Sequence, residues 1–358
     1  MDKTTQKQFN EKARKHGILT IKVPPHYKQL VDEEIKVLGR IKGPLYRAVY
    51  PTQDRMVVKI DHEVPDFVED RTNMPRDLEN VLVHKYYNRA LFLVTDVCAG
   101  HCMYCFRQDV LSDLQARELP AINRKLEAVI TYLKEHPEVT ELIMSGGDPL
   151  SVPFQYLEQA IQRLKTETHI QDIRVHTRNV AFAPRVLSEQ LCELLGKYHV
   201  RMYLHIIHPY EIVDSVIEGI QRLRNNGVKL YGQFPVLRGI NDHYKVLEKL
   251  ICHMDQLEVN PINIFIPDPI NYSAPFRISM KRLLSLMDNL YWKTSSWTNA
   301  VRLVMDTPIG KVRREDMTAW DKKNGVITFH RDGKTITYHD FPENLDIPGD
   351  LETLLWRS

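Results

Sequence analysis

Three of the five cysteines in this chain lie within the short segment VCAGHCMYC. Cys98, Cys102 and Cys105 have the spacing C-x3-C-x2-C, whereas Cys192 and Cys252 stand alone in helix-like apolar patterns typical of buried thiols. Such a triad could bind a structural zinc ion together with His101, because zinc prefers four protein ligands. It could equally hold a [4Fe–4S] cluster and leave one iron open, which is a catalytic feature. Structural zinc sites usually pair two C-x2-C knuckles, and the sequence has no second pair.

Strand and helix patterns alternate six times from about residue 90, and they must position this triad. We expect strands over 90–95, 141–145, 173–177, 202–206, 228–234 and 262–266, and helices near 123–135, 154–165, 187–197, 211–226, 244–257 and 279–293. Six strand–helix pairs in series predict an α/β fold with a parallel sheet and right-handed crossovers. The count fits a partial (β/α)6 barrel better than a closed eight-fold barrel. The triad follows the first strand, where barrels of this kind place their chemistry.

We expect three parts along the chain. Residues 1–85 are irregular and form an accessory segment, residues 86–295 form the barrel, and residues 296–358 form a C-terminal extension. The extension contains a strand over 301–306 and a hairpin over 326–339, which is indicated by an Asp-Gly turn between two alternating runs.

The composition excludes several classes of protein. The 48 basic and 46 acidic residues give a net charge of +2, which offers no argument for nucleic-acid binding through charge. No window approaches 18 uninterrupted apolar residues, and the N-terminus lacks the apolar stretch of a secretory signal. Sparse cysteines without signs of a disulfide framework predict reduced thiols and a cytoplasmic protein.

With these motifs in place, the chain resembles the radical S-adenosylmethionine superfamily, and within it the lysine 2,3-aminomutase family. YNRALFLVTDVC, MSGGDPL, HIIHPYEI, VLRGIND and DTPIGK occur in that family's order over about residues 40–340. The resemblance implies an isomerase with a partial barrel fold. It would move the α-amino group of a basic L-amino acid, lysine or arginine, to the β-carbon. Breaking an unactivated C–H bond is beyond side-chain acids and bases, so a cofactor must do it.

The resemblance implies three cofactors: a [4Fe–4S] cluster, S-adenosyl-L-methionine and pyridoxal 5′-phosphate. Cys98, Cys102 and Cys105 would hold the cluster. S-adenosylmethionine would meet Ser145, Gly146, Gly147, Asp148, His205 and Gln233. Lys311 would be the Schiff-base lysine, and Lys85, Tyr86 and Arg89 match the cluster that binds the phosphate of pyridoxal phosphate. The substrate carboxylate would pair with Arg107, and a cationic side chain with Asp268 and Asp306.

The sequence departs from the family in three places. The glycine-rich run before the lysine is shortened to PIGK, so the loop at Lys311 differs. The C-terminus has no cysteine and His243 replaces another family cysteine, so we expect no zinc. The N-terminal arm is shorter than in the free-lysine enzymes.

The remaining expectations concern partners and alternatives. The resemblance implies an electron donor such as flavodoxin or ferredoxin and a homo-oligomer, with no nucleic acid or membrane partner. Two carboxylates favour a cationic substrate over glutamate. Three alternatives stay open: desaturation, modification of a protein-bound lysine, and a non-catalytic iron–sulfur or zinc protein. A radical enzyme without pyridoxal phosphate that modifies RNA or peptide is a further competitor.

Overall fold

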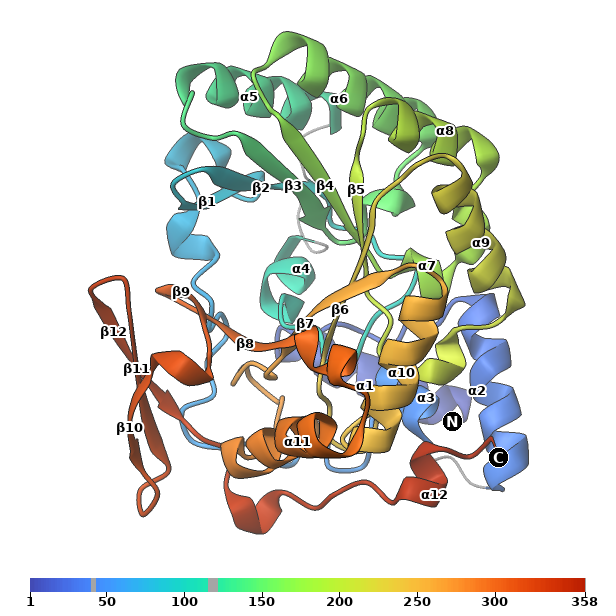
Figure 1. Cartoon of the computed structure of the whole chain (residues 1–358), viewed down its shortest axis with the longest axis vertical. Helices are drawn as coiled ribbons and strands as arrows, with labels where there is room; N and C mark the ends of the chain where they lie inside the picture. Colours follow the sequence, from blue (N-terminus) through green and yellow to red (C-terminus); the bar gives the residue numbers. More distant parts are fainter. Residues whose placement is uncertain (40–42, 115–121, 358) are drawn as a thin grey trace.

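A curved nine-stranded sheet forms the centre of the structure, a computed structural model that describes residues 1–39, 43–114 and 122–357 (Figure 1). Its strands follow the order of the chain from β1 to β9. They are β1 Leu82–Tyr86, β2 Arg89–Thr95, β3 Glu141–Gly146, β4 Asp172–Thr177, β5 Arg201–Leu204, β6 Leu230–Pro235, β7 Asn260–Phe265, β8 Arg302–Thr307 and β9 Gly310–Val312. The strands from β2 to β8 run parallel, and β1 and β9 add an antiparallel edge at each end.

Helices cover the outer face of this sheet, one after each of the strands β2 to β7 (Figure 1). The six covering helices are α5 Ile122–Glu135, α6 Phe154–Glu167, α8 Glu189–Lys197, α9 Asp214–Asn225, α10 Tyr244–Gln256 and α11 Met280–Lys293. Two shorter helices lie in loops, α4 Gln108–Leu114 and α7 Asn179–Phe182. The expected partial barrel of six strand–helix units is therefore confirmed. The seventh parallel strand, β8, lies where the sequence predicts a strand over 301–306.

Strand alternation separates an apolar outer face from a polar interior. On β4, Ile173 and Val175 are fully buried in the core beneath the helices. The residues between them face the other way, and His176 stacks on Tyr203 of β5 with ring centroids 4.7 Å apart. Because parallel strands in register present the same face, the polar side chains of neighbouring strands meet inside the barrel.

Both chain termini pack around this barrel. The N-terminal part contains α1 Lys3–Lys15, α2 Pro25–Leu38 and α3 Pro44–Val49. The C-terminal part contains a three-stranded antiparallel sheet, β10 Met317–Asp321, β11 Val326–Arg331 and β12 Lys334–His339, followed by α12 Leu351–Leu354. The expected hairpin is β11–β12, and the sequence pattern missed β10.

The nine-stranded sheet runs across both expected boundaries between the three parts, because β1 ends at Tyr86 and β8 follows residue 296. Among the helices of the described residues, none combines the length and apolar character needed to cross a membrane.

Candidate active site

The three clustered cysteines lie in the loop that joins β2 to α4. Their thiols are reduced and close enough to influence one another, because Cys102 adds to the rise in the pKa of Cys105, which burial takes to about 12. Burial also raises the pKa of Cys98 well above its ordinary value, with Asp148 and the other two thiols as further causes. Neutral thiols are thus favoured in the protein alone, and a bound cation would be needed to hold them as thiolates.

This donor set fits a cluster better than a single ion. The Nδ1 atom of His101 lies 2.7 Å from the carbonyl oxygen of Thr20, so this ring turns to the N-terminal segment. Among the described residues, no three His, Cys, Asp or Glu side chains converge on one ion position. Cys192 and Cys252 lie on α8 and α10, outside the cysteine loop. Three thiol donors in one loop, with His101 turned to the N-terminal segment, fit a [4Fe–4S] cluster.

The Ser145–Asp148 element spans the end of β3 and the first residues after it, and it lies against the start of the cysteine loop. Backbone N–H groups of Gly147 and Asp148 donate to the carbonyl oxygens of Thr95 and Val97 at 2.6 and 2.8 Å. A Cβ atom on Gly147 would lie 2.4 Å from the carbonyl oxygen of Val97, so only glycine allows this approach. The element therefore sets the position of the backbone that leads into Cys98.

Asp148 is a brace between two loops. Its buried carboxylate accepts hydrogen bonds from the Thr177 hydroxyl and from the backbone N–H groups of Leu150, Arg178 and Asn179, all at 2.8–3.0 Å. Both carboxylate oxygens are occupied, so this side chain joins the loops after β3 and β4. It leaves the backbone of the glycine pair as the part of the element that can meet a ligand.

His205 and Gln233 enter the barrel interior from the ends of β5 and β6, as expected. The Tyr104 hydroxyl lies 3.1 Å from Nε2 of His205, and the rings stack at 5.9 Å. The Gln233 amide donates to Nδ1 of His176 at 3.1 Å. Burial lowers the pKa values of both histidines well below the ordinary value, and neighbouring arginines add to the effect, so both rings are neutral. These contacts connect the cysteine loop to the strand ends.

Lys311 and its acidic neighbours lie at the opposite end of the sheet. Lys311, on β9, pairs through Nζ with Oδ1 of Asp306 on β8 at 2.5 Å, and this ammonium lies 5.0 Å from the ring centroid of Phe265. Burial first, and then repulsion by Asp306, raise the pKa of Asp268 well above its ordinary value, while Lys311 acts in the opposite sense. Two carboxyl groups and one amine thus share this part of the interior.

The C-terminal sheet holds the lysine strand in place. Arg331 of β11 donates from Nη1 to the carbonyl oxygen of Lys311 at 2.9 Å. Gly310 has a positive φ of 105°, which the shortened PIGK loop can adopt because the residue lacks a Cβ atom. The tight turn is closed by the Thr307 hydroxyl, which donates to the Gly310 carbonyl oxygen at 2.6 Å.

The expected phosphate-binding residues flank the same turn. A Cβ atom on Gly310 would lie 3.3 Å from the Tyr86 ring, so that ring packs against the turn. The Arg89 guanidinium lies over the same ring, with 3.9 Å from Cζ to the ring centroid. Lys85 differs, because its Nζ donates to the carbonyl oxygens of Val68 and Thr307. All three are half-buried, and the Arg89 guanidinium, which contacts the Tyr86 ring and the Asn88 side chain, is the cation that would meet a phosphate.

Arg107 faces the interior and has a partner that sequence reasoning missed. Its Nε donates to Oδ2 of Asp70 at 2.7 Å, and its Nη1 donates to the Ser145 hydroxyl at 3.0 Å. Asp70 lies in the irregular N-terminal part, where no strand or motif marks it. His176, which lies within the expected strand over 173–177, was also missed, whereas Tyr104 stands in the cysteine motif itself.

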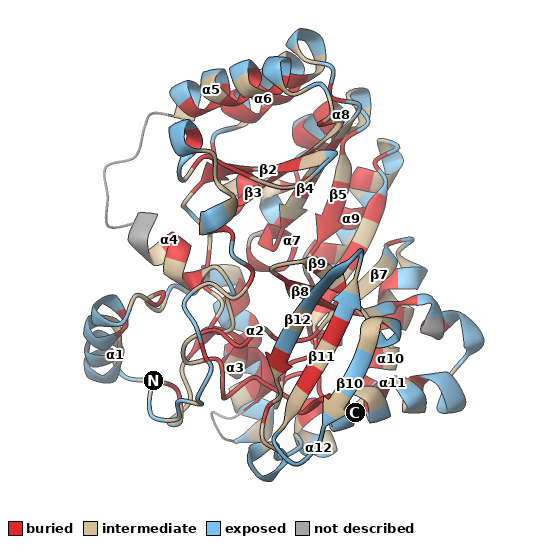
Figure 2. Ribbon diagram, turned by 90° about the vertical axis from the view of Figure 1, so that its left-hand side faces the viewer, coloured by how far each residue is buried: buried red, intermediate tan, exposed pale blue. Residues whose placement is uncertain are grey.

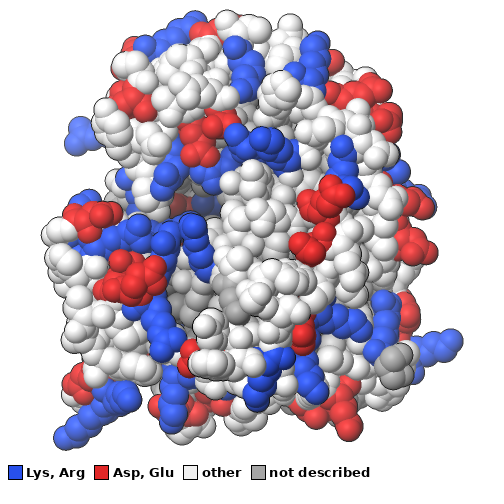
Figure 3. All heavy atoms as spheres, in the orientation of Figure 1, with Lys and Arg blue, Asp and Glu red and all other residues white. Residues whose placement is uncertain are grey.

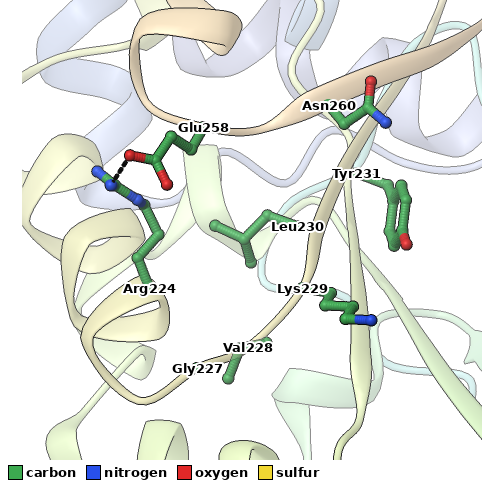
Figure 4. A pocket seen from close by; sticks show the side chains of 8 residues that line it. All are labelled: Arg224, Gly227, Val228, Lys229, Leu230, Tyr231, Glu258 and Asn260. Atoms are coloured by element: carbon green, nitrogen blue, oxygen red, sulfur yellow. Dashed lines mark hydrogen bonds and ion pairs between the residues drawn. The ribbon is translucent and has the colours of Figure 1, made fainter.

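The surface is hollowed on the side where the two ends of the sheet approach each other. In Figure 3, Lys and Arg side chains gather around this hollow, with acidic residues among them. A separate pocket of about 350 Å³ lies at the amino ends of β6 and β7, lined by Lys229, Tyr231 and Asn260 among others (Figure 4). In this pocket Arg224 and Glu258 form an ion pair with each other. The pocket lies at the end of the strands away from the cysteine loop.

Comparison with known proteins supports this geometry. The sequence profile of the radical SAM superfamily matches residues 92–251. The L-lysine 2,3-aminomutase of Escherichia coli strain K12 is 31% identical over 258 residues, which cover 70% of this chain and 73% of that protein. The enzymes of the same name from Bacillus subtilis strain 168 and Acetoanaerobium sticklandii are each 28% identical. These alignments cover 91% and 95% of this chain, and 67% and 80% of the relatives.

Proposed function

Because the chain belongs to the lysine 2,3-aminomutase family of radical S-adenosylmethionine enzymes, we propose that it converts a free basic L-amino acid, lysine or arginine, into its β-amino isomer. The chain is a radical S-adenosylmethionine aminomutase, an isomerase, and the cofactors of its family are a [4Fe–4S] cluster, S-adenosylmethionine and pyridoxal 5′-phosphate. To this family assignment the proposal adds the substrate class and the residues that recognise the substrate.

The observation that carries this proposal is the distribution of charge inside the barrel. Asp268 and Asp306 lie beside Lys311 at one end of the sheet, and Arg107 enters from the other end on the cysteine loop. Burial lowers the pKa of His176, and Arg107 and Lys311 both add to the effect, so cations of both groups lie within electrostatic reach of this ring. A basic α-amino acid has a carboxylate at one end and a cation at the other, and it would match both groups.

Bound in this interior, the cluster and S-adenosylmethionine supply a carbon radical, and pyridoxal phosphate supplies the carrier for the migrating amino group. The three cysteines would hold the cluster, and the glycine pair would present backbone to S-adenosylmethionine. Arg107 would bind the substrate carboxylate and fix the distance of the β-carbon. Positioning of this kind matters because a radical reacts with whatever it touches first.

Lys311 and the substrate cation would compete for the same carboxylates. In the protein alone, the Lys311 ammonium neutralises Asp306 across 2.5 Å. To act as an amine, Lys311 must give up a proton, and the Oδ1 atom of Asp306 is the acceptor in direct contact. Once this proton has passed from Asp306 to solvent, the Asp306 carboxylate can take the cationic side chain of the substrate together with Asp268.

A substrate panel tests the proposal: lysine, arginine, ornithine, glutamate and alanine, assayed anaerobically with dithionite and S-adenosylmethionine. We expect β-amino product from lysine or arginine and none from glutamate. Asp268→Asn should raise KM about tenfold or more, because a charge-assisted hydrogen bond is worth roughly 1.5–3 kcal/mol. Asp321→Asn, on exposed β10, is the matched control and should leave KM unchanged. Turnover of glutamate at comparable kcat/KM would refute the proposal that the site recognises a cationic side chain. Inactivity toward every free amino acid would favour a protein-bound lysine as the substrate.

Borohydride reduction provides a separate test of the lysine. The reduced adduct with pyridoxal phosphate should be found on Lys311 by mass spectrometry. An adduct on Lys85, which is also inside the barrel, would show that the motif transfer is wrong at Lys311.

A further inference from the structure

The N-terminal helix α1 carries a concentration of exposed positive charge. Residues 1–22 contain six Lys or Arg and two acidic residues, a net charge of +4 in a chain whose total is +2. The side chains of Lys3, Lys7, Lys12, Arg14 and Lys15 are exposed, and Ala13 is the buried residue of the helix. Within the part of the chain that the structure describes, none of these cations has an ion-pair partner.

This helix contributes little to the core, through the buried Ala13 and the half-buried Phe9. Figure 2 shows α1 at the margin of the molecule, coloured mostly as exposed, near α4. A helix whose charges served only to keep the protein in solution would need no particular neighbour in the fold. The segment that follows α1, residues 17–22, however, leads directly to the cysteine loop.

Several contacts join this segment to the cysteines. The Nζ atom of Lys22 donates to the carbonyl oxygen of Cys98 at 2.7 Å, and the backbone N–H of His101 donates to the carbonyl oxygen of Lys22 at 2.8 Å. Leu19 is buried in a small apolar cluster against which Cys98 and Cys105 pack. One short stretch of chain therefore separates the basic helix from two of the three cysteines.

We propose that α1 and Lys22 form the docking surface for an acidic, low-potential one-electron carrier protein. The isomerisation consumes no net electron, but the family's chemistry starts from a reduced cluster, and the carrier is the reductant: it loses one electron and the [4Fe–4S]2+ cluster gains one to become [4Fe–4S]1+. Electron transfer falls steeply with distance, so a carrier must dock on the surface beside the cysteine loop. The positive face lies there, and it would attract a carrier of opposite charge.

Nucleic acid is the other polyanion that a basic helix could bind. A carrier is favoured because the charge is confined to one short helix beside the cysteines, whereas the remaining residues sum to −2 and would not attract an extended polyanion. Because α1 lies at the margin of the molecule, its charged face is also open to a partner.

The test uses Lys7→Gln/Arg14→Gln/Lys15→Gln in the full-length protein with its cluster reconstituted. Glutamine keeps a helix propensity close to that of lysine and arginine while it removes the charge. Reduced flavodoxin serves as the probe, and stopped-flow absorbance follows cluster reduction directly, apart from turnover. The second-order rate at low ionic strength should fall about tenfold or more, because electrostatic steering is worth 10–1,000-fold in association rate.

The matched control is Lys322→Gln/Lys323→Gln/Lys334→Gln, which removes three exposed cations from the C-terminal sheet. This control should be reduced at the unaltered rate, and turnover driven by dithionite should be the same for all three proteins. Equal flavodoxin rates in the α1 variant and the control would overturn the proposal. So would a rate in the unaltered protein that does not fall as salt is raised, or binding of a short DNA duplex that depends on α1 in place of flavodoxin. Loss of aminomutase activity with every substrate would refute the proposed function but leave this result standing.

Discussion

The glycine pair after β3 offers a strong test of how the site is positioned, through Gly147→Ala. The added Cβ atom would lie 2.4 Å from the carbonyl oxygen of Val97 and 2.7 Å from its carbon. Ordinary contact begins near 3.4 Å, so the two backbones must separate by about 1.0 Å. Backbone cannot rotate away as a flexible side chain can, and Val97 immediately precedes Cys98. The shift therefore moves the first cysteine relative to the other two.

We expect three effects of Gly147→Ala. Overpacking should lower the free energy of unfolding by roughly 1–3 kcal/mol. A displacement near 1 Å should lower kcat/KM by about 100-fold. The iron content after anaerobic reconstitution and the affinity for S-adenosylmethionine, measured by calorimetry, should both fall.

Gly227→Ala separates the displacement from general destabilisation. Gly227 has a φ of 72° with no heavy atom within 4 Å of an added Cβ atom, so alanine there strains only the backbone, by roughly 1–2 kcal/mol. It lies between α9 and β6, at the end of the barrel away from the cysteines. The iron content and kcat/KM of the Gly227→Ala protein should match those of the unaltered protein. A Gly147→Ala protein with full iron content and unchanged kcat/KM would refute the reasoning.

Two further predictions concern the thiols and pH. Cys102→Ala should prevent assembly of the four-iron cluster, as determined by iron analysis and electron paramagnetic resonance, whereas Cys192→Ala should retain it; full loading of the Cys102 variant would show that the triad is not the ligand set. Burial raises the pKa of Glu34 to about 7 from an ordinary value of 4.5. The free energy of unfolding should therefore be highest below pH 4.5 as far as this group is concerned and fall by roughly 3 kcal/mol as pH rises through 7. Glu34→Gln should flatten that dependence in denaturant titrations, and an unchanged slope would contradict it.

The sequence predicted the barrel because its signals are local. Each parallel strand is a short apolar run and each covering helix has a strong 3.6-residue pattern, so the alternation from residue 90 to residue 306 could be followed without tertiary information. The edges were missed for the opposite reason. β9 has only three residues, and β1 is separated from β2 by a two-residue turn, so neither produces a periodic pattern of its own.

Site residues that stand in a sequence motif could be predicted, whereas site residues that are recognised only by a contact in the fold could not. Cys98 and Lys311 stand in distinctive short motifs. Asp70 contacts Arg107 across 37 positions of sequence, from an irregular segment without periodicity. Lys85 was expected to face a phosphate, and its hydrogen bonds to the carbonyl oxygens of Val68 and Thr307 depend on how two distant strands approach. Sequence spacing contains no information of that kind. The assignments of the site residues to ligands stay predictions.

The two ends of the nine-stranded sheet approach each other without a hydrogen-bonded ladder, since the strand order of the described chain begins at β1 and ends at β9. They are joined by side chains: Lys85 of β1 reaches the carbonyl oxygen of Thr307 on β8, and the Tyr86 ring covers Gly310. The barrel therefore has a seam. Parting a seam held by a few side chains leaves every strand pair intact, whereas opening the barrel anywhere else would break a ladder. The seam lies beside Lys311 on β9, so parting it would open the interior next to this amine.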